Sequence, residues 1–173
     1  MKKLLIILVG LVAVVLAVAA VLPKDFKIEQ QIIINKPVAE VYNYLRFFSN
    51  TSQWNPWDKK DPNIVKEFKG TDGEVGSISS WSGNNEVGVG EEEITNLVSN
   101  KRIDFELRFK KPMKTTNNGY FEFEEISKTH TKVTWVMEGK TKFPFNILCH
   151  FMRGSVEKDF ATGLENIKTN LEK

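Results

Sequence analysis

Apolar and charged side chains alternate without interruption in the segment Ile103-Asp104-Phe105-Glu106-Leu107-Arg108-Phe109-Lys110. Successive residues of a strand point to opposite faces of a sheet, so this pattern predicts a strand with one dry face and one wet face. A strand of this kind belongs to an antiparallel sheet whose dry face is covered by another element. Because a slip of one residue would exchange the two faces, the alternation also determines the register with the neighbouring strands.

Similar segments lie on both sides, separated by turn residues at intervals of about ten positions. The expected strands are 64–68, 77–82, 87–97, 103–109, 120–126 and 132–138. Short alternating strands with regular turn signals are typical of consecutive antiparallel hairpins. A further strand is expected over 26–34, followed by a helix after Pro37 that carries Val38, Val41, Tyr42 and Leu45 on one face. The sheet should therefore contain about seven strands.

The periodicity changes near the C-terminus, where apolar residues recur every three or four positions at Val156, Phe160, Leu164, Ile167 and Leu171. This spacing predicts an amphipathic helix of about 20 residues from Arg153 onward. It is the one long amphipathic element able to cover the dry face of the sheet. We therefore expect an α+β fold in which a curved antiparallel sheet wraps around the C-terminal helix, leaving a gap between them that forms a pocket.

The N-terminus carries 19 consecutive residues, Leu4 to Leu22, without a charged or hydrogen-bonding side chain. As a helix they would rise about 28 Å, close to the ~30 Å hydrocarbon core of a bilayer. Lys2 and Lys3 favour a cytoplasmic N-terminus, and Pro23 ends the helix. We expect a membrane anchor over residues 1–23 and a domain over 24–173 on the extracytoplasmic side. The alternative is a cleaved signal peptide, with Ala17-Val18-Ala19 as its processing site.

The charge balance and the reactive side chains exclude several classes of function. Without Lys2 and Lys3 the chain has 22 basic and 22 acidic residues, so it lacks the basic footprint of a nucleic-acid-binding protein. Cys149 is the single cysteine, and His130 and His150 have no neighbours at metal-ligand spacing. No phosphate-binding loop or hydrolase nucleophile motif occurs. We therefore expect no metal, no cofactor and no nucleic-acid partner, and we assign no catalytic residue.

One polar run inside the predicted sheet has chemical potential, the triplet Glu91-Glu92-Glu93. Alternate residues of a strand face opposite sides, so at least one carboxylate should face inward. Burial would raise the pKa of such a carboxylate and suit it to general acid or base catalysis. The alternative is that this part of the strand lies at an edge and all three side chains are hydrated.

The segment from Phe47 to Asp61 should be an irregular loop with a short helical turn, because it contains Ser, Asn, Thr and two prolines around Trp54-Asn55-Pro56-Trp57. The backbone polar groups of a loop need water or turn partners, which disfavours deep burial. Two indoles nevertheless need apolar surface to cover. We therefore expect Trp54 and Trp57 to cap the mouth of the pocket.

The order of the expected elements resembles the helix-grip fold of the START-like, or polyketide cyclase/dehydrase and lipid transport, superfamily (SRPBCC) over residues 26–173. The motifs that resemble this superfamily are Trp54-Asn55-Pro56-Trp57, the hairpin glycines Gly73, Gly76, Gly83, Gly88 and Gly90 with Trp81 and Ile94, Val133-Thr134-Trp135-x-Met137-x-Gly139, and Lys158-Asp159-Phe160-x-x-Gly163-Leu164-x-Asn166-Ile167-Lys168. The resemblance implies a pocket for a lipid, isoprenoid, polyketide or other apolar molecule, in a superfamily where many members bind and release without catalysis.

These observations lead to one principal hypothesis, a membrane-anchored protein that binds a hydrophobic small molecule or lipid between the curved sheet and the C-terminal helix. The candidate ligand-binding residues are large apolar side chains on the strands, the tryptophan loop and the helix, namely Trp54, Trp57, Trp81, Phe105, Leu107, Phe121, Phe123, Trp135, Met137, Phe160 and Leu164. Two alternatives stay open. One is a cyclase- or dehydratase-like enzyme that uses an inward acid such as Glu91 or Glu93, and the other is a non-catalytic interaction module at the membrane whose cavity is collapsed.

Overall fold

The seven strands form a single antiparallel sheet in the order β1-β7-β6-β5-β4-β3-β2 in the computed structural model, which describes all residues from 1 to 173. The strands are β1 (Asp25–Ile34), β2 (Val65–Lys69), β3 (Ile78–Ser82), β4 (Val89–Val98), β5 (Arg102–Lys111), β6 (Thr115–Ser127) and β7 (His130–Lys140). β2 to β7 follow one another as hairpins, and β1 adds to the sheet beside β7. The expected strands are confirmed. β6 begins five residues before the predicted position because Asn117 and Asn118, poor strand formers, pair with Leu107 and Glu106 of β5.

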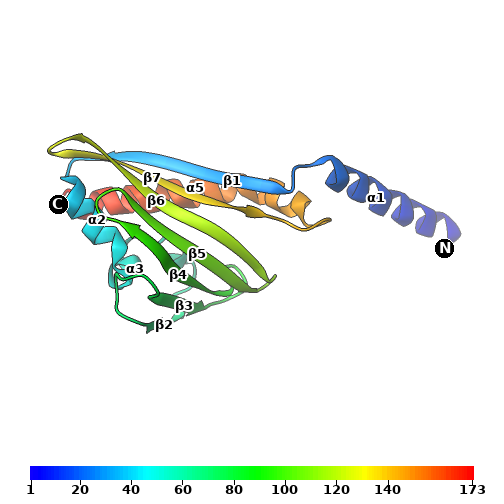
Figure 1. Cartoon of the computed structure of the whole chain (residues 1–173). Coiled ribbons are helices and arrows are strands. Elements are labelled where there is room, and N and C mark those ends of the chain that lie inside the picture. The colour runs from blue at the N-terminus through cyan, green and yellow to red at the C-terminus, as the bar shows by residue number, and fades with distance from the viewer.

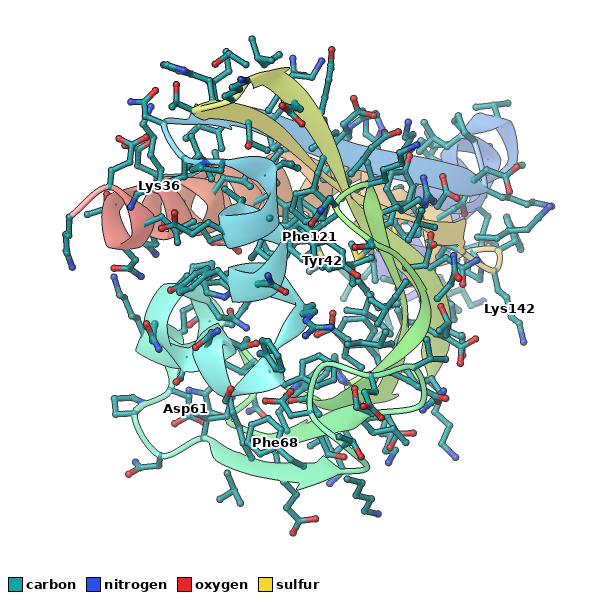
Figure 2. The ribbon with its side chains drawn as sticks, turned by 60° about the vertical axis from the view of Figure 1, so that its left-hand side comes forward. Lys36, Tyr42, Asp61, Phe68, Phe121 and Lys142 are labelled. Carbon is teal, nitrogen blue, oxygen red and sulfur yellow. The ribbon has the colours of Figure 1, made fainter.

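The helices lie outside the ends of the sheet or against its inner face (Figure 1). They are α1 (Lys2–Val21), α2 (Val38–Arg46), the 3₁₀ turn η1 (Phe48–Asn50), α3 (Thr51–Trp54), α4 (Trp57–Lys60) and α5 (Asn146–Leu171). α5 runs along β1, α2 packs on β6 and β7, and α3 packs against α5. Figure 2 shows Tyr42 of α2 and Phe121 of β6 in the interior between these layers.

The alternation along β5 produces the two faces that the sequence predicts. Ile103 and Phe105 are buried in the core, whereas Asp104, Glu106 and Arg108 lie on the outer face. Gly119 of β6 is the cross-strand partner of Phe105, and a Cβ atom there would lie 2.1 Å from the Phe105 ring. Because Gly119 has no side chain, the Phe105 ring can pack directly against the backbone of β6. The register of β4 with β5 also shifts between Ile94 and Asn96, which allows the sheet to curve.

The C-terminal helix is longer than predicted, with 26 residues starting at Asn146 instead of about 20 starting at Arg153. Its second half buries Phe160, Leu164 and Ile167 against the sheet, as the spacing predicts. Its first two turns extend beyond the core, so their apolar residues do not follow the periodicity of a buried face. The pattern of the buried face alone therefore underestimated the length of the helix.

The contact between Phe105 and Gly119 can be tested by adding one methyl group. We expect Gly119→Ala to lower the free energy of unfolding by about 1–3 kcal/mol, because the methyl group must displace a buried ring. Gly154 is the matched control, since it lies exposed in α5 with no atom near the position of an added Cβ. Gly154→Ala should stabilise the protein by about 0.5–1 kcal/mol through helix propensity. Thermal melts of the full-length protein in detergent measure both, and equal effects would contradict the close approach.

Candidate functional site

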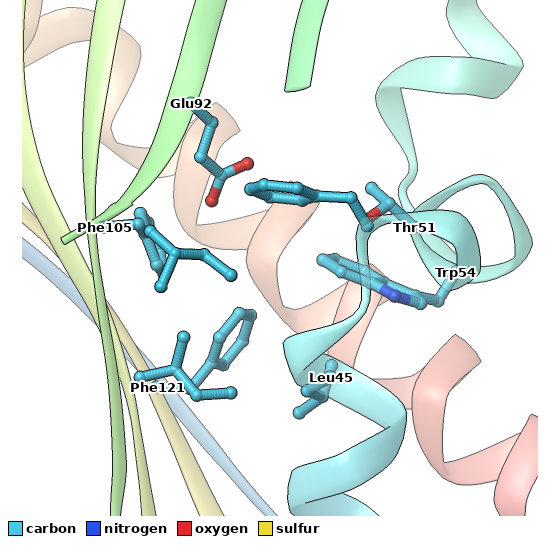
Figure 3. Close-up of a pocket in the computed structure, with 9 residues that line it drawn as sticks. Leu45, Thr51, Trp54, Glu92, Phe105 and Phe121 are labelled. Carbon is cyan, nitrogen blue, oxygen red and sulfur yellow. The ribbon is translucent and has the colours of Figure 1, made fainter. Parts of the chain in front are cut away.

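A small, partly open pocket lies between the inner face of β4, β5 and β6 and the elements α2, η1 and α3 (Figure 3). Its nine lining residues include seven hydrophobic ones, and the set is Leu45, Phe48, Thr51, Trp54, Glu92, Ile94, Ile103, Phe105 and Phe121. The cavity volume is about 20 Å³. A cavity of this size has room for about one water molecule. The core at this position is therefore almost completely filled.

The segment Phe47–Trp54, which we call the lid, closes the pocket on the side of the helices. The Asp72 carboxylate accepts hydrogen bonds from the backbone N–H groups of Phe48 at 2.7 Å and Ser49 at 3.0 Å. These bonds fix the start of η1 and hold the Phe48 ring over the cavity. Gly73 follows in the left-handed region with a φ of 77°, and its bare Cα accommodates the Phe47 ring.

Trp54 lies in the core, where only 5% of its surface is exposed. Its indole packs edge-to-face on Phe121 and Trp135, with ring centroids 6.0 and 5.4 Å apart. The prediction that Trp54 lies at the pocket mouth is wrong. Side-chain amides donate hydrogen bonds to the backbone carbonyls of the lid, and this pairing allows the loop to be buried. The Asn166 amide of α5 donates to the Trp54 carbonyl at 2.9 Å, so the loop can be buried without leaving that carbonyl unpaired.

Trp57 takes a different position, half-buried at the start of α4. Its ring lies edge-on against Trp135 and Phe160, with both centroids 6.2 Å away, and the Lys60 ammonium is 5.9 Å from its centroid. The Asn55 side chain accepts a hydrogen bond from the Trp57 backbone N–H at 2.9 Å, which shapes the turn between α3 and α4. Trp57 thus covers the apolar cluster while one edge of it faces solvent.

Trp135 of β7 and Phe160 of α5 stack face to face with centroids 4.0 Å apart and fill the space between the sheet and the C-terminal helix. Of the other predicted ligand contacts, Phe105 and Phe121 line the pocket, whereas Trp81 packs on Phe109 away from it. The rest lie in or against the core outside the pocket lining, namely Leu107, Phe123, Met137 and Leu164. The pocket therefore lies on the α2–α3 side of the sheet, beside the region where we expected the gap.

Glu92 is the single charged residue in the pocket lining, and the strand register explains its position. It pairs with Ser79 of β3 and Leu107 of β5, both of which lie on the inner side of the sheet. Burial raises the pKa of Glu92 to about 7, and the charge of Lys66 opposes this shift only in part. Lys66 itself forms an ion pair with Asp58 of α4. Glu92 extends into the pocket toward the lid (Figure 3).

Glu91 and Glu93 lie on the opposite face, so the expectation that one of them is the inward acid is wrong. Both carboxylates bind the Arg108 guanidinium, each at 2.7 Å, and Glu106 binds the same group. Hydrogen bonds from Lys110 and Arg108 lower the pKa of Glu91. The triplet contains one inward carboxylate, as the alternation requires, but its identity depends on a register that the triplet alone does not reveal.

A lone carboxylate in an apolar pocket has a limited set of chemical uses. With a pKa near neutrality it can accept a hydrogen bond when ionised, donate one when protonated, or exchange a proton with a bound molecule. No three His, Cys, Asp or Glu side chains lie close enough together to hold a metal ion. The arrangement suits a mostly apolar molecule that carries one polar group.

The sequence analysis missed six of the nine pocket residues. Ile103 could have been found, because it alternates with Phe105, which was already placed on the inner face, whereas no residue of the strand that contains Ile94 had been placed. To identify Glu92, one had to know which alternate residues of β4 face inward. Leu45 was placed correctly on the buried face of the first helix but not in the pocket. Phe48 and Thr51 lie in the lid, which has no periodic pattern.

Comparisons with known proteins agree with this architecture. A family model described as "Polyketide cyclase / dehydrase and lipid transport" matches residues 25–172. MLL2253 from Mesorhizobium loti has a similar structure, with a TM-score of 0.63, 14% identity, and coverage of 85% of this chain and 97% of its own. For the Aha1 dimer from Colwellia psychrerythraea the values are 0.56, 18%, 83% and 93%. For DynU16, from the dynemicin biosynthetic locus, they are 0.59, 12%, 85% and 47%. At these identities the solved structures share the fold alone, and no curated protein matches the sequence.

Replacement of Glu92 should change how stability depends on pH. The pKa of this side chain is about 7 in the folded protein and near 4.5 when it is unperturbed, so the folded state holds the proton more tightly. The resulting stability is present below pH 4.5 and lost as the pH rises through 7. Glu92→Gln should therefore be more stable than the parent at pH 8, by up to about 3 kcal/mol, and similar to it near pH 4.5.

Thermal melts of the full-length protein across this pH range measure the difference. Glu165→Gln, on the exposed side of α5, is the control and should show a difference from the parent that does not depend on pH. A Glu92→Gln difference that stays constant from pH 4.5 to 8 would show that the carboxylate is hydrated in solution.

Proposed function

We propose that this chain, which belongs to the polyketide cyclase/dehydrase and lipid transport family, is a membrane-anchored protein that binds a hydrophobic small molecule or lipid in the pocket beneath the lid. The observation that carries the proposal is the partly buried Glu92 carboxylate, the one charged group in a pocket lined otherwise by apolar side chains and Thr51. Burying a charged group among apolar side chains is costly, and a hydrogen bond from a ligand hydroxyl or amine would offset that cost.

Binding requires the lid to move, because pockets for drug-sized molecules measure about 300–1,000 Å³ and this cavity measures about 20 Å³. The lid is held by the packing of Phe48 and Trp54 and by hydrogen bonds between Asp72 and η1 and from Asn166 and Asn170 to the carbonyls of α3, so opening must break both kinds of contact. Displacement of Phe48 and Trp54 would open the apolar wall of Phe105 and Phe121 to a ligand.

A second candidate function is favoured by the same cavity volume. A core with room for only one water fits a non-catalytic interaction module in which the fold is filled and the surface contacts the partner. The two candidates differ in whether an apolar molecule ever reaches the inner wall of β5 and β6.

The N-terminal helix is the one helix in the protein that is long and apolar enough to cross a membrane, and by these properties it could be an anchor or a signal sequence. We infer that it is an anchor, because its C-terminal end is part of the domain's packing. Ala19 is fully buried, and the buried Asn146 amide donates to the carbonyls of Ala19 at 2.7 Å and Leu22 at 3.0 Å. Cleavage after Ala19 would remove one of these partners. Lys2 and Lys3 favour a domain on the extracytoplasmic side.

Ligand access is tested with a clickable, photoreactive fatty acid added to membranes that contain the full-length protein. We expect cross-links in peptides that cover the lid and the inner wall, in addition to cross-links in α1. Thr51→Phe should abolish the pocket cross-links, since its ring would occupy the space that a ligand needs when the lid opens, while α1 labelling persists. Thr129→Phe, in the exposed turn between β6 and β7, should leave both unchanged. Labelling confined to α1 in the parent protein would favour the filled module.

Anchoring is tested by alkaline carbonate extraction followed by intact mass measurement. We expect the protein to stay in the membrane pellet at its full mass of 19.8 kDa. Extraction into the supernatant, with a mass that lacks residues 1–19, would show that the helix is a signal peptide.

A further inference from the structure

The first turns of α5 and the loop before them expose an apolar surface that the core does not use. The exposed fractions are 46% for Phe143, 47% for Phe145, 45% for Leu148, 76% for Phe151 and 59% for Met152. We call these five residues the apolar patch. Leu148, Phe151 and Met152 share one helix face through their i, i+3, i+4 spacing, whereas Asn146 and Cys149 face Ala19 and Thr141. A stripe of large apolar side chains in water is unfavourable, so this surface needs a partner.

The patch lies directly beside the point where α1 leaves the domain. The hydrogen bonds from Asn146 to Ala19 and Leu22 join the start of α5 to the end of α1, and the Thr141 N–H donates to the Lys24 carbonyl at 2.8 Å. Asn146 to Met152 spans only about 9 Å of helix. If α1 crosses the bilayer, this length is comparable to the headgroup region, which adds roughly 5–7 Å on each side of the hydrocarbon core, so the patch starts at the membrane surface.

Most charges near the patch are basic, although Lys140 forms an ion pair with Asp25 of β1 and Arg153 forms one with Glu157 of α5. From Gly139 to Val156 the chain carries Lys140, Lys142 and Arg153 and no acidic residue. The antiparallel register brings the β5–β6 turn to the same end of the sheet, because Asp25 pairs with Lys140 and Phe109 pairs with Thr115. This turn adds the exposed Lys111 and Lys114 beside the partly exposed Met113. Lys142 and Lys36 lie at opposite ends of the domain (Figure 2), and α1 leaves from the Lys142 end (Figure 1).

We propose that the apolar patch, together with the nearby Lys111, Lys114, Lys140 and Lys142, docks on the surface of the bilayer that holds α1. The phenylalanines and the apolar face of early α5 enter the headgroup region, and the lysines bind anionic lipid phosphates. Aromatic side chains combined with Lys and Arg are the composition of interfacial helices. This proposal rests on the anchoring role of α1, and it adds that the domain lies on the membrane in one orientation.

The test uses full-length protein with Cys149→Ser, reconstituted in vesicles, and a single new cysteine labelled with the environment-sensitive fluorophore NBD. With Phe151→Cys the emission should shift to the blue and be quenched severalfold more strongly by doxyl-labelled lipid than with Lys128→Cys, the control at the far end of the domain. Quenching at position 151 should be stronger with phosphatidylglycerol than with phosphatidylcholine. The added substitutions Lys142→Glu and Lys111→Glu should remove that difference between lipids.

Equal, weak quenching at both positions would overturn the docking proposal while carbonate extraction still reports an intact anchor. Release of the chain by carbonate would overturn both. Strong protection at position 151 without quenching by doxyl lipid, together with cross-linking between copies of the chain, would show that a second protein molecule covers the patch, and would also overturn the proposal.

Discussion

The whole domain depends on covering one apolar sheet face that is too wide for a single helix. α5 packs along β1, and the stacked pair of Trp135 on β7 and Phe160 on α5 joins the two layers at 4.0 Å between ring centroids. This short separation is possible because Gly163 has no side chain, since a Cβ there would lie 2.8 Å from the Trp135 ring. The remaining face, over β4 to β6, is covered by α2 and the lid, and the pocket lies beneath that second cover. Two separate elements therefore cover the sheet, and the pocket lies beneath α2 and the lid instead of beneath the C-terminal helix, where we expected it.

The location of the pocket also determines its chemistry. The inner face of β4 presents Gly90, Glu92 and Ile94 in turn, so the acidic side chain lies between a glycine covered by the Trp81 ring and a branched apolar residue. On the outer face Arg108 forms ion pairs with Glu91, Glu93 and Glu106 together. Three carboxylates around one guanidinium form a solvated network, whereas the fourth is left in a place where burial dominates its ionisation. Because alternate residues of β4 face opposite sides of the sheet, Glu91 and Glu93 are surface charges, whereas Glu92 is the charged group that a ligand in the pocket could contact.

Those parts of the structure that repeat with a period could be predicted from the sequence. The alternation in Ile103–Lys110 and the spacing of Phe160, Leu164 and Ile167 gave the right elements on the right faces, because burial on one side imposes a regular pattern. Non-periodic segments could not be predicted in the same way. The burial of Trp54 depends on an amide 112 residues away in the chain, at Asn166, and no local pattern contains that information. The start of α5 was missed for a related reason, since its exposed face is apolar and does not alternate with the core.

The connection between the apolar helix and the sheet has a mechanical consequence. Only Leu22, Pro23 and Lys24 separate α1 from β1, and Asn146 binds the carbonyl of Leu22 within this link. Three extended residues reach about 10 Å, so if α1 is a membrane anchor the domain cannot move far from the bilayer surface. A carrier on a long flexible linker can reach a second membrane, but a domain joined this closely to its anchor stays at one membrane. If it hands on a bound molecule, the recipient must diffuse laterally in the same bilayer or come to it.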